Sequence, residues 1–420
     1  MDLEIVMFNM SSYSEWQKGT VNRNYHIFYK LLNRPEIGRI IAVDFLPFTF
    51  KRALRNYWEN ILFGPEGKVV YRDLTTRCVK IDGYPAELYV FSTIDSIFSH
   101  KLVIKKLNKV LNLIEVQSSK FKVYSSPKRM IWSYFPMFVD CFSAEGGENL
   151  PHDLMVFDAV DNWIKHPSFI RYKKLLEDNY QTIAKKSDLI FVVADALVEF
   201  FKKIGRKKDV YWIANGVDVS HFAESQLSII NDKLFNKIPH PVIGYVGTIQ
   251  HRIDLGLLEY LAKNNPDKSF VLVGPLWPVF LRKLRRPAVE IKKLKKYKNV
   301  YLLGRKFWEE TPAYIKKFDV GISPHKLDEF SKYTNSLKVL EYLACGLPVV
   351  ATPTSEVERF SHFIYISRDY GNFSEKIDLA LKNDTMELRN LRIARVKQED
   401  WDLKVGEIMK YIIEKVKTKK

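Results

Sequence analysis

The sequence has no long apolar run, and none of its hydrophobic stretches reaches the roughly 18 residues that a membrane-spanning helix needs. It has only 3 cysteines, Cys78, Cys141 and Cys345. They are far apart and lack metal-ligand spacing, so we expect reduced thiols. The opening MDLEIVMFNM has an acidic Asp2 and no basic leader, which predicts a buried first strand rather than a signal peptide.

Acidic residues are scarce relative to basic ones, with 49 Asp and Glu against 66 Lys and Arg, a formal net charge of +17. Such an excess attracts anionic partners: a nucleic acid, a phosphorylated substrate or a lipid surface. Hydrophobic residues at 46% and charged residues at 27% are ordinary for a soluble globular protein. A chain of 420 residues is too long for one core and indicates two or three domains.

Short β-rich runs alternate with helical segments throughout the chain, which predicts an α/β fold with parallel sheets. The strand candidates are apolar on both faces, as buried parallel strands are. They lie at 3–8, 39–44, 88–91, 129–135, 154–158, 188–193 and 209–214, and then at 241–247, 269–275, 299–304, 319–324 and 347–352.

This rhythm predicts two doubly wound, Rossmann-like domains joined near residues 216–240. The N-terminal domain spans 1–220 and the C-terminal domain 237–397. A long final helix, 398–418, is expected to return to the N-terminal domain. In such folds ligands bind at the carboxyl ends of parallel strands, so the expected site is a cleft between the domains.

The segment YTNSLKVLEYLACGLPVVAT (333–352) predicts a helix from Ser336 to Cys345, with Gly346 after its end. The helix is apolar nearly all round, apart from Lys338 and Glu341 on one face. Free N–H groups and a lysine at a helix start suit a phosphate, and a glutamate one turn later suits the hydroxyls of a ribose. A solvated Lys–Glu pair is the alternative, and the spacing leaves both open.

An ordered series of motifs, and NSLKVLEYLACGLPVVAT above all, resembles GT-B-fold glycosyltransferases, especially the family-four-like enzymes of surface-polysaccharide and teichuronic acid synthesis. The series also includes PVIGYVGTIQHRIDLGLLEYLAKNNPDKSFVLVGP, NVYLLGRKFWEETPAYIKKFDVGISPH, SDLIFVVADALVEFFKKIG with IANGVDVSHF, and IWSYFP with VFDAVDNW. It covers about residues 129–355 and extends weakly to both ends.

The resemblance implies a C-terminal domain that holds a nucleotide-sugar and an N-terminal domain that holds the acceptor. Glu341 would bind the ribose, and Lys338 with Ser336 the diphosphate. Gly247 and Thr248 would approach the phosphates, because a small residue lets the backbone come close. Arg305 would lie beside the base and His325 at a strand end nearby. A strand-ending turn at Gly247, a surface charge at Arg305 and a structural His325 are the alternatives.

One departure from the family pattern concerns the mechanism. Many retaining members carry a second glutamate upstream of the ribose-binding one, and Tyr333 stands at that position here. An inverting enzyme needs a general base beside the acceptor. Asp161 is the preferred candidate and Asp158 the second, with helix or loop capping as the alternative for both. His152-Asp153 is a weaker candidate, because it precedes its strand.

The acceptor side also includes the loop after the first strand, where Gly19 and Arg23 are candidate acceptor contacts; a helix start with a solvated arginine is the alternative. We expect no metal and no cofactor. The one Asp-x-Asp, Asp400 to Asp402, stands at the start of the last helix, where acidic side chains need no metal to explain them.

Two basic amphipathic segments, 48–64 and 101–114, predict peripheral contact with anionic lipid at the inner face of the membrane, in an otherwise cytoplasmic protein with a lipid-linked acceptor. The face predicted in the first segment comprises Phe50, Leu54, Tyr57, Trp58 and Ile61. Packing of both segments on the N-terminal sheet is the alternative. A nucleotide-sugar epimerase of the same fold and a nucleic-acid-binding protein are the competing functions, but no nucleic-acid-binding motif is apparent.

Overall fold

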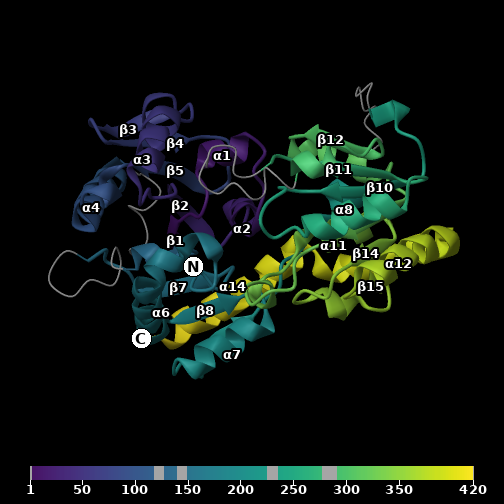
Figure 1. Cartoon of the computed structure of the whole chain (residues 1–420). Helices are drawn as coiled ribbons and strands as arrows, with labels where there is room; N and C mark the ends of the chain where they lie inside the picture. The colour runs from purple at the N-terminus through teal and green to yellow at the C-terminus, as the bar shows by residue number, and fades with distance from the viewer. Residues whose placement is uncertain (1, 118–126, 140–148, 225–234, 277–290, 420) are drawn as a thin grey trace. The chain divides into compact units, whose positions relative to one another are not determined.

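A computed structural model describes residues 2–117, 127–139, 149–224, 235–276 and 291–419 of the chain (Figure 1). It divides into two compact units. Unit 1 comprises Met1–Ile213 with Val405–Lys420, and unit 2 comprises Ala214–Lys404. The last helix, α14 (Trp401–Thr418), therefore begins in unit 2 and continues in unit 1.

Unit 1 is built on a nine-stranded sheet in the order β3-β4-β5-β2-β1-β6-β7-β8-β9. All neighbouring strands pair in parallel except at the edge, where β4 is antiparallel to both β3 and β5. The strands are β1 (Leu3–Phe8), β2 (Ile37–Val43), β3 (Lys68–Arg72), β4 (Thr76–Ile81), β5 (Glu87–Thr93), β6 (Lys128–Ser133), β7 (Leu154–Ala159), β8 (Leu189–Val192) and β9 (Val210–Trp212). The seven predicted strands of this half are confirmed, and the β3–β4 hairpin is an addition.

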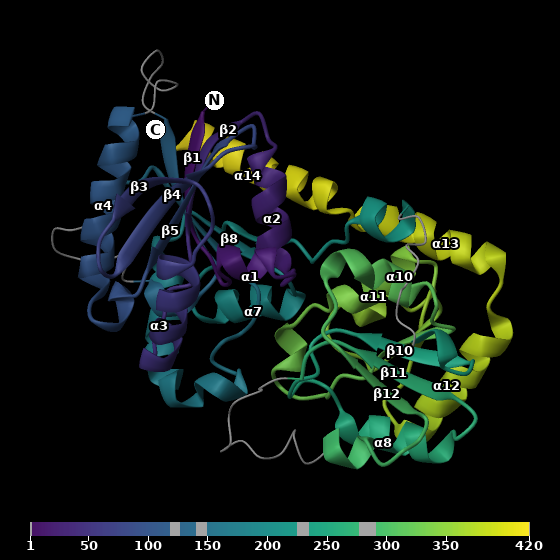
Figure 2. The ribbon, with the colours of Figure 1, turned by 90° about the horizontal axis from the view of Figure 1, so that it is seen from above.

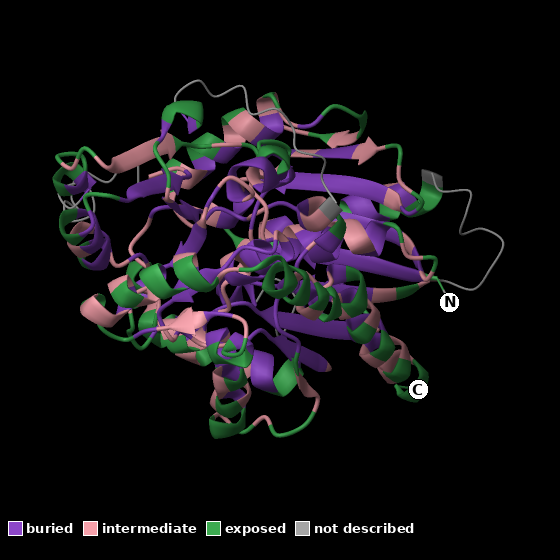
Figure 3. Cartoon of the chain, turned by 90° about the vertical axis from the view of Figure 1, so that its right-hand side faces the viewer, coloured by how far each residue is buried: buried purple, intermediate pink, exposed green. Residues whose placement is uncertain are grey.

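The helices of unit 1 are α1 (Tyr13–Gln17), α2 (Arg23–Leu32), α3 (Phe50–Asn56), α4 (His100–Gln117), α6 (Lys173–Lys186) and α7 (Asp195–Lys203). A π-helix, η1 (Tyr57–Leu62), continues α3 directly. The C-terminal part of α14 packs on this unit, since the rings of Tyr211 and Tyr411 stack with centroids 3.8 Å apart. The burial of β1 and β7 along their whole length shows that the sheet is the centre of the core (Figure 3).

Unit 2 is built on a six-stranded, wholly parallel sheet in the order β12-β11-β10-β13-β14-β15. The strands are β10 (Val242–Val246), β11 (Ser269–Val273), β12 (Val300–Gly304), β13 (Val320–Ser323), β14 (Val349–Ala351) and β15 (Tyr365–Ile366). The helices are α8 (Leu255–Asn264), α10 (Thr311–Ile315), α11 (Leu337–Ala344), α12 (Tyr370–Asn383) and α13 (Met386–Val396). Every strand predicted in this half is present.

Two apolar layers enclose this second sheet, as Figure 2 shows with α8 on one face and α10 and α11 on the other. Alternate residues of β10 enter different layers, Val242 and Val246 with α10 and α11, and Ile243 and Tyr245 with α8 and α12. This alternation is the period of two that a strand buried on both faces requires. Because α11 connects β13 to its parallel neighbour β14, the helix starts at the carboxyl edge of the sheet.

Candidate active site

Glycines end three neighbouring strands of unit 2. Gly247, Gly274 and Gly304 close β10, β11 and β12 with φ values of +148°, +146° and +71°. The Gly274 N–H donates to Gly304 O over 2.7 Å, and a Cβ added to Gly274 would lie 2.0 Å from Gly247 O. Only glycine tolerates this crowding and these backbone angles. The strand ends therefore form a surface of bare backbone.

Helix α11 begins beside this surface, and its bounds match the predicted helix to within one residue at each end. Ser336 is the N-cap by position, but its side chain makes no capping hydrogen bond. Its Oγ is buried and has no hydrogen-bond partner. The first turn of α11 thus lacks the side-chain acceptor that usually satisfies a helix N-terminus.

Lys338 and Glu341 lie together on α11, with Lys338 Nζ 3.5 Å from Glu341 Oε2. Glu341 is only 9% exposed, so the pair is not the fully solvated surface pair of the alternative interpretation. A Cβ on Gly247 would lie 2.6 Å from Lys338 Cε. The structure therefore brings the predicted residues Gly247, Lys338 and Glu341 into one place.

Arg252 is a cation near this place that the sequence analysis did not single out. Its carbonyl accepts a hydrogen bond from Lys326 N over 2.8 Å, and its guanidinium lies over the Phe330 ring, 4.7 Å from the centroid. Burial, together with the charges of Arg252 and Lys338, lowers the pKa of His325 to about 3. His325 is consequently neutral near pH 7 and faces two cations. The sequence holds one signal that could have pointed to Arg252: it stands two residues before Asp254, the N-cap of α8, and therefore near the start of a helix.

The remaining candidates of this unit also lie at strand ends. Thr248 follows Gly247, and its carbonyl accepts a hydrogen bond from the Tyr245 hydroxyl over 3.2 Å. Arg305 follows β12 directly and is exposed. His325 follows β13, and its N–H donates to Thr352 Oγ1 over 3.1 Å. All three are placed at the predicted edge, and their roles stay predictions.

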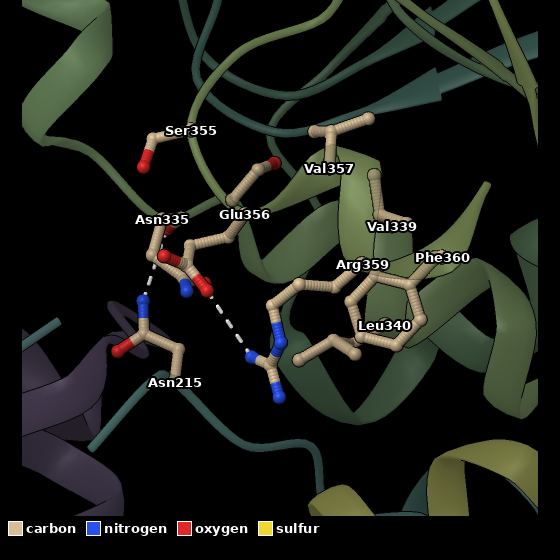
Figure 4. A pocket seen from close by; sticks show the side chains of 10 residues that line it. Asn215, Asn335, Val339, Leu340, Ser355, Glu356, Val357, Arg359 and Phe360 are labelled. Atoms are coloured by element: carbon tan, nitrogen blue, oxygen red, sulfur yellow. Dashed lines mark hydrogen bonds and ion pairs between the residues drawn. The ribbon is translucent and has the colours of Figure 1, made fainter. Parts of the chain in front are cut away.

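A small pocket lies beside the start of α11 (Figure 4). It is lined by Asn215, Asn335, Ser336, Val339, Leu340, Ser355, Glu356, Val357, Arg359 and Phe360. The Asn215 amide donates to Asn335 O over 3.0 Å, and Glu356 pairs with Arg359 at 3.2 Å. The bond to Asn335 fixes the loop that leads into α11.

In unit 1, a buried ion pair joins two candidates that the sequence separates by more than a hundred residues. Arg23 Nε donates to both oxygens of Asp158, over 2.9 and 3.0 Å, and Arg23 Nη1 donates to Ile213 O over 3.0 Å. Arg23 is 3% exposed and Asp158 is 0% exposed. Burial raises the pKa of Asp158, and the charge of Arg23 opposes this rise. The alternative of a solvated arginine at position 23 is therefore wrong.

Asp161 lies in the loop after β7, and its carbonyl accepts a hydrogen bond from the Tyr180 hydroxyl over 3.0 Å. It is largely buried, and it caps no helix, because the next two helical segments have His166 and Tyr172 as their N-caps. Gly19 ends α1 with φ +79°, and its N–H donates to Trp16 O. A helix-ending turn accounts for this glycine.

The weaker acidic candidates have structural partners. Asp153, before β7, accepts hydrogen bonds from Arg129 N and Lys128 Nζ. Asp400 accepts from the backbone N–H groups of Asp402 and Val219, as a helix cap does. Among the described residues, no group of three or more His, Cys, Asp or Glu side chains could hold a metal ion. Nor does any helix in the described ranges have the length and apolarity to cross a membrane.

Substituting Asp158 with Asn should lower the free energy of unfolding by about 3–5 kcal/mol, because the charge of Arg23 would stay buried without its counterion. Urea unfolding of wild type and variant measures the difference. Asp153→Asn, at an exposed carboxylate, is the control and should change little. The double variant Arg23→Met with Asp158→Leu should regain most of the loss. Equal stability of Asp158→Asn and wild type would contradict the ion pair.

Comparisons with known proteins agree with this architecture. Residues 240–383 match the family model "Glycosyl transferases group 1". The chain is 26% identical over 275 residues to the putative teichuronic acid biosynthesis glycosyltransferase TuaH of Bacillus subtilis (strain 168). That alignment covers 62% of this chain and 66% of TuaH.

Solved structures of similar fold extend over nearly the whole chain. Anabaena Alr3699/HepE, in complex with UDP and glucose, superposes with a TM-score of 0.64 at 13% identity, covering 98% of this chain and 99% of HepE. The UDP-forming α,α-trehalose-phosphate synthase of Burkholderia xenovorans, in complex with glucose-6-phosphate, gives a TM-score of 0.65 at 10% identity, with 98% and 99% coverage. These structures show that the whole chain has a GT-B fold, and the similarity to the glycosyl transferase family model extends over residues 240–383.

Proposed function

We propose that this protein transfers a sugar from a nucleotide-sugar to a lipid-linked glycan acceptor in the synthesis of a cell-surface polysaccharide. The observation that carries the proposal is the placement of Lys338 and Glu341 in the first turns of α11, directly against Gly247. Support for the donor class comes from HepE, which has been crystallised in complex with UDP-glucose. Support for the polysaccharide comes from the name of TuaH.

In this proposal the nucleotide lies along the start of α11. The Glu341 carboxylate accepts hydrogen bonds from the two ribose hydroxyls. Its ion pair with Lys338 breaks when the nucleotide binds. Lys338 and Arg252 face the diphosphate from two sides, and the bare backbone at Gly247 admits it closely. Ser336 Oγ, buried and without a partner, gains one in the ligand. Thr248 and His325 border the phosphates, and Arg305 lies beside the base.

Replacing either residue of the pair, by Lys338→Ala or Glu341→Ala, should weaken binding of the preferred nucleoside diphosphate at least tenfold and leave the fold intact. Thermal shift over a panel of nucleoside mono- and diphosphates measures this, since a ligand at a hundred times its Kd stabilises by about 2.7 kcal/mol. Lys332→Ala, an exposed cation paired with Glu329, is the matched control. Wild-type affinity in either test variant would remove that residue from the donor site.

The general base of the reaction is Asp161 in this proposal. Asp158 is fully buried and held by Arg23, so it is poorly placed to take a proton from an acceptor hydroxyl. Its ion pair instead fixes the end of β7, from which the Asp161 loop departs. The cations at α11 stabilise the leaving diphosphate, so that transfer needs no divalent metal and no cofactor.

Changing Asp161 to Asn should abolish sugar transfer and spare nucleotide binding, because the amide keeps the shape and cannot accept the proton. Donor consumption is measured with and without acceptor, in EDTA and with added Mg²⁺. We expect equal wild-type rates in both media. Near-normal transfer by the variant would exclude Asp161 as the base. Donor conversion without any acceptor would favour the epimerase alternative.

We propose a membrane surface for the acceptor because α3 and η1 expose an apolar stripe. Phe50, Leu54, Trp58 and Phe63 are 75%, 53%, 52% and 75% exposed. Ile61, which was predicted to belong to the exposed face, is 2% exposed and therefore part of the core. Phe63, which was not predicted to belong to it, is exposed. Among the flanking cations, Arg52 and Arg55 pair with Glu15 and Glu59.

The second predicted segment behaves differently. In α4 the apolar residues Val103, Leu107 and Val110 are each 0% exposed, so this face packs inside unit 1. The prediction that α4 offers an apolar face to lipid is wrong, because the helix needs that face to cover the fold. The membrane proposal therefore rests on the stripe of α3 and η1 alone.

A variant carrying Phe50→Ser and Leu54→Ser should lose binding to anionic vesicles at least tenfold, since each exposed apolar side chain contributes about 1.5–3 kcal/mol when fully buried. Sedimentation with anionic and with neutral vesicles at low salt measures it. The matched control, Met386→Ser with Leu391→Ser, removes exposed apolar side chains from α13 in unit 2. Wild-type protein that stays in the supernatant with both lipids would point to a soluble acceptor.

A further inference from the structure

Unit 1 contains a cavity of about 420 Å³ that none of the predicted acceptor residues lines. Its wall comes from α1 and the residue after it, from η1 and the segment after it, and from the end of β4. The lining residues are Ser14, Gln17, Lys18, Glu59, Phe63, Gly64, Pro65, Glu66 and Ile81. A cavity of this volume falls in the range of small-ligand sites.

The π-helix η1 shapes one side of this cavity. Phe63 N donates to Trp58 O over 3.1 Å, which closes the wide turn. Gly64 follows, and a Cβ there would lie 2.0 Å from Asn60 O, so only glycine can stand at this point. π-turns inside helices often occur at functional sites. Here the turn leaves the Phe63 ring at the edge of the cavity instead of in the core.

Two aromatic rings stand exposed at this edge. Trp58 and Phe63 stack with centroids 6.0 Å apart and an interplanar angle of 15°. Both are more than half exposed, and with Phe50 and Leu54 they form a run of neighbouring exposed apolar side chains, the kind of patch that marks an interaction surface. An aromatic face offers an apolar surface to the C–H side of a sugar ring.

The polar lining matches the hydroxyl side of such a ring. Glu59 and Glu66 supply carboxylates, Gln17 an amide and Ser14 a hydroxyl, all able to bond sugar hydroxyls. The wall is also firmly held, since Ser14 Oγ donates to Asn60 Oδ1 and Lys18 Nζ lies 3.5 Å from Glu59 Oε1. Preorganisation of this kind lowers the cost of binding.

We propose that this cavity holds the saccharide end of an amphiphilic acceptor, whose apolar chain lies along Phe50, Leu54 and Trp58. The assignment deepens the proposed function and depends on it. Phe63 is the residue common to the polar cavity and the apolar stripe, so an occupant with both parts fits the surface better than a free sugar or a simple lipid.

The test uses octyl glycosides of several sugars, below their critical micelle concentrations, with tryptophan fluorescence as the readout. At least one octyl glycoside should bind ten times more tightly than the methyl glycoside of the same sugar, and also more tightly than an octyl sulfobetaine. Phe63→Ala should weaken it at least tenfold and Glu66→Gln severalfold. Leu74→Ala, an 84% exposed residue at the opposite end of the β3–β4 hairpin, is the control.

Nucleoside diphosphate binding is measured in the same samples and should be unchanged in all these variants. A loss of glycoside binding with nucleotide binding intact supports the cavity assignment. Wild-type protein that binds glycosides but no nucleotide would contradict the proposed function and not the cavity. The assignment is overturned if no octyl glycoside binds, if the sulfobetaine binds equally well, or if Phe63→Ala binds like wild type.

Discussion

The close approach of α11 to the end of β10 is the constraint on which the candidate donor site depends. The Tyr342 hydroxyl accepts a hydrogen bond from Val246 N over 2.8 Å, which ties the helix to the strand. A Cβ at Gly321 would lie 2.7 Å from the Tyr342 ring, so the neighbouring strand must carry glycine there. The Tyr342 hydroxyl, together with the close packing at Gly247 and Gly321, thus holds Lys338 and Glu341 at the carboxyl edge of the sheet. A longer side chain at Gly321 would displace the Tyr342 ring, and one at Gly247 would displace the end of the Lys338 side chain.

In unit 1, a buried ion pair instead of close packing at glycines holds separate segments together. The buried pair of Arg23 and Asp158 joins the start of α2 to β7, and a second bond of Arg23 reaches the carbonyl of Ile213, just after β9. Three separate segments therefore meet at one guanidinium. The arrangement holds the carboxyl end of β7, from which the Asp161 loop departs. The cavity beside η1 is shaped in yet another way, by a π-helical turn that is followed by Gly64.

The sequence predicted best where local chemistry decides the structure. The bounds of α11 follow from its N-cap residue, its apolar pattern and Gly346, all within one segment. The pairing of Arg23 with Asp158 could not be predicted from local sequence, because the two residues come together only through the tertiary fold. The β3–β4 hairpin was missed because β3 is short and largely exposed, so it lacks the longer apolar run, buried on both faces, by which the other strands were predicted. Both α3 and α4 are amphipathic, and amphipathicity alone does not tell a buried apolar face from an exposed one. The fold buried the face of α4 and left that of α3 open.

The most direct test of the account is a crystal structure with the nucleoside diphosphate that gives the largest thermal shift. The account predicts the ribose hydroxyls within hydrogen-bonding distance of the Glu341 carboxylate. It also predicts the diphosphate between Gly247, Lys338 and Arg252, with the Glu341 carboxylate turned from Lys338 to the ribose. A nucleotide bound elsewhere, or one at this edge that leaves the Lys338–Glu341 pair intact and touches neither residue, would contradict the central claim.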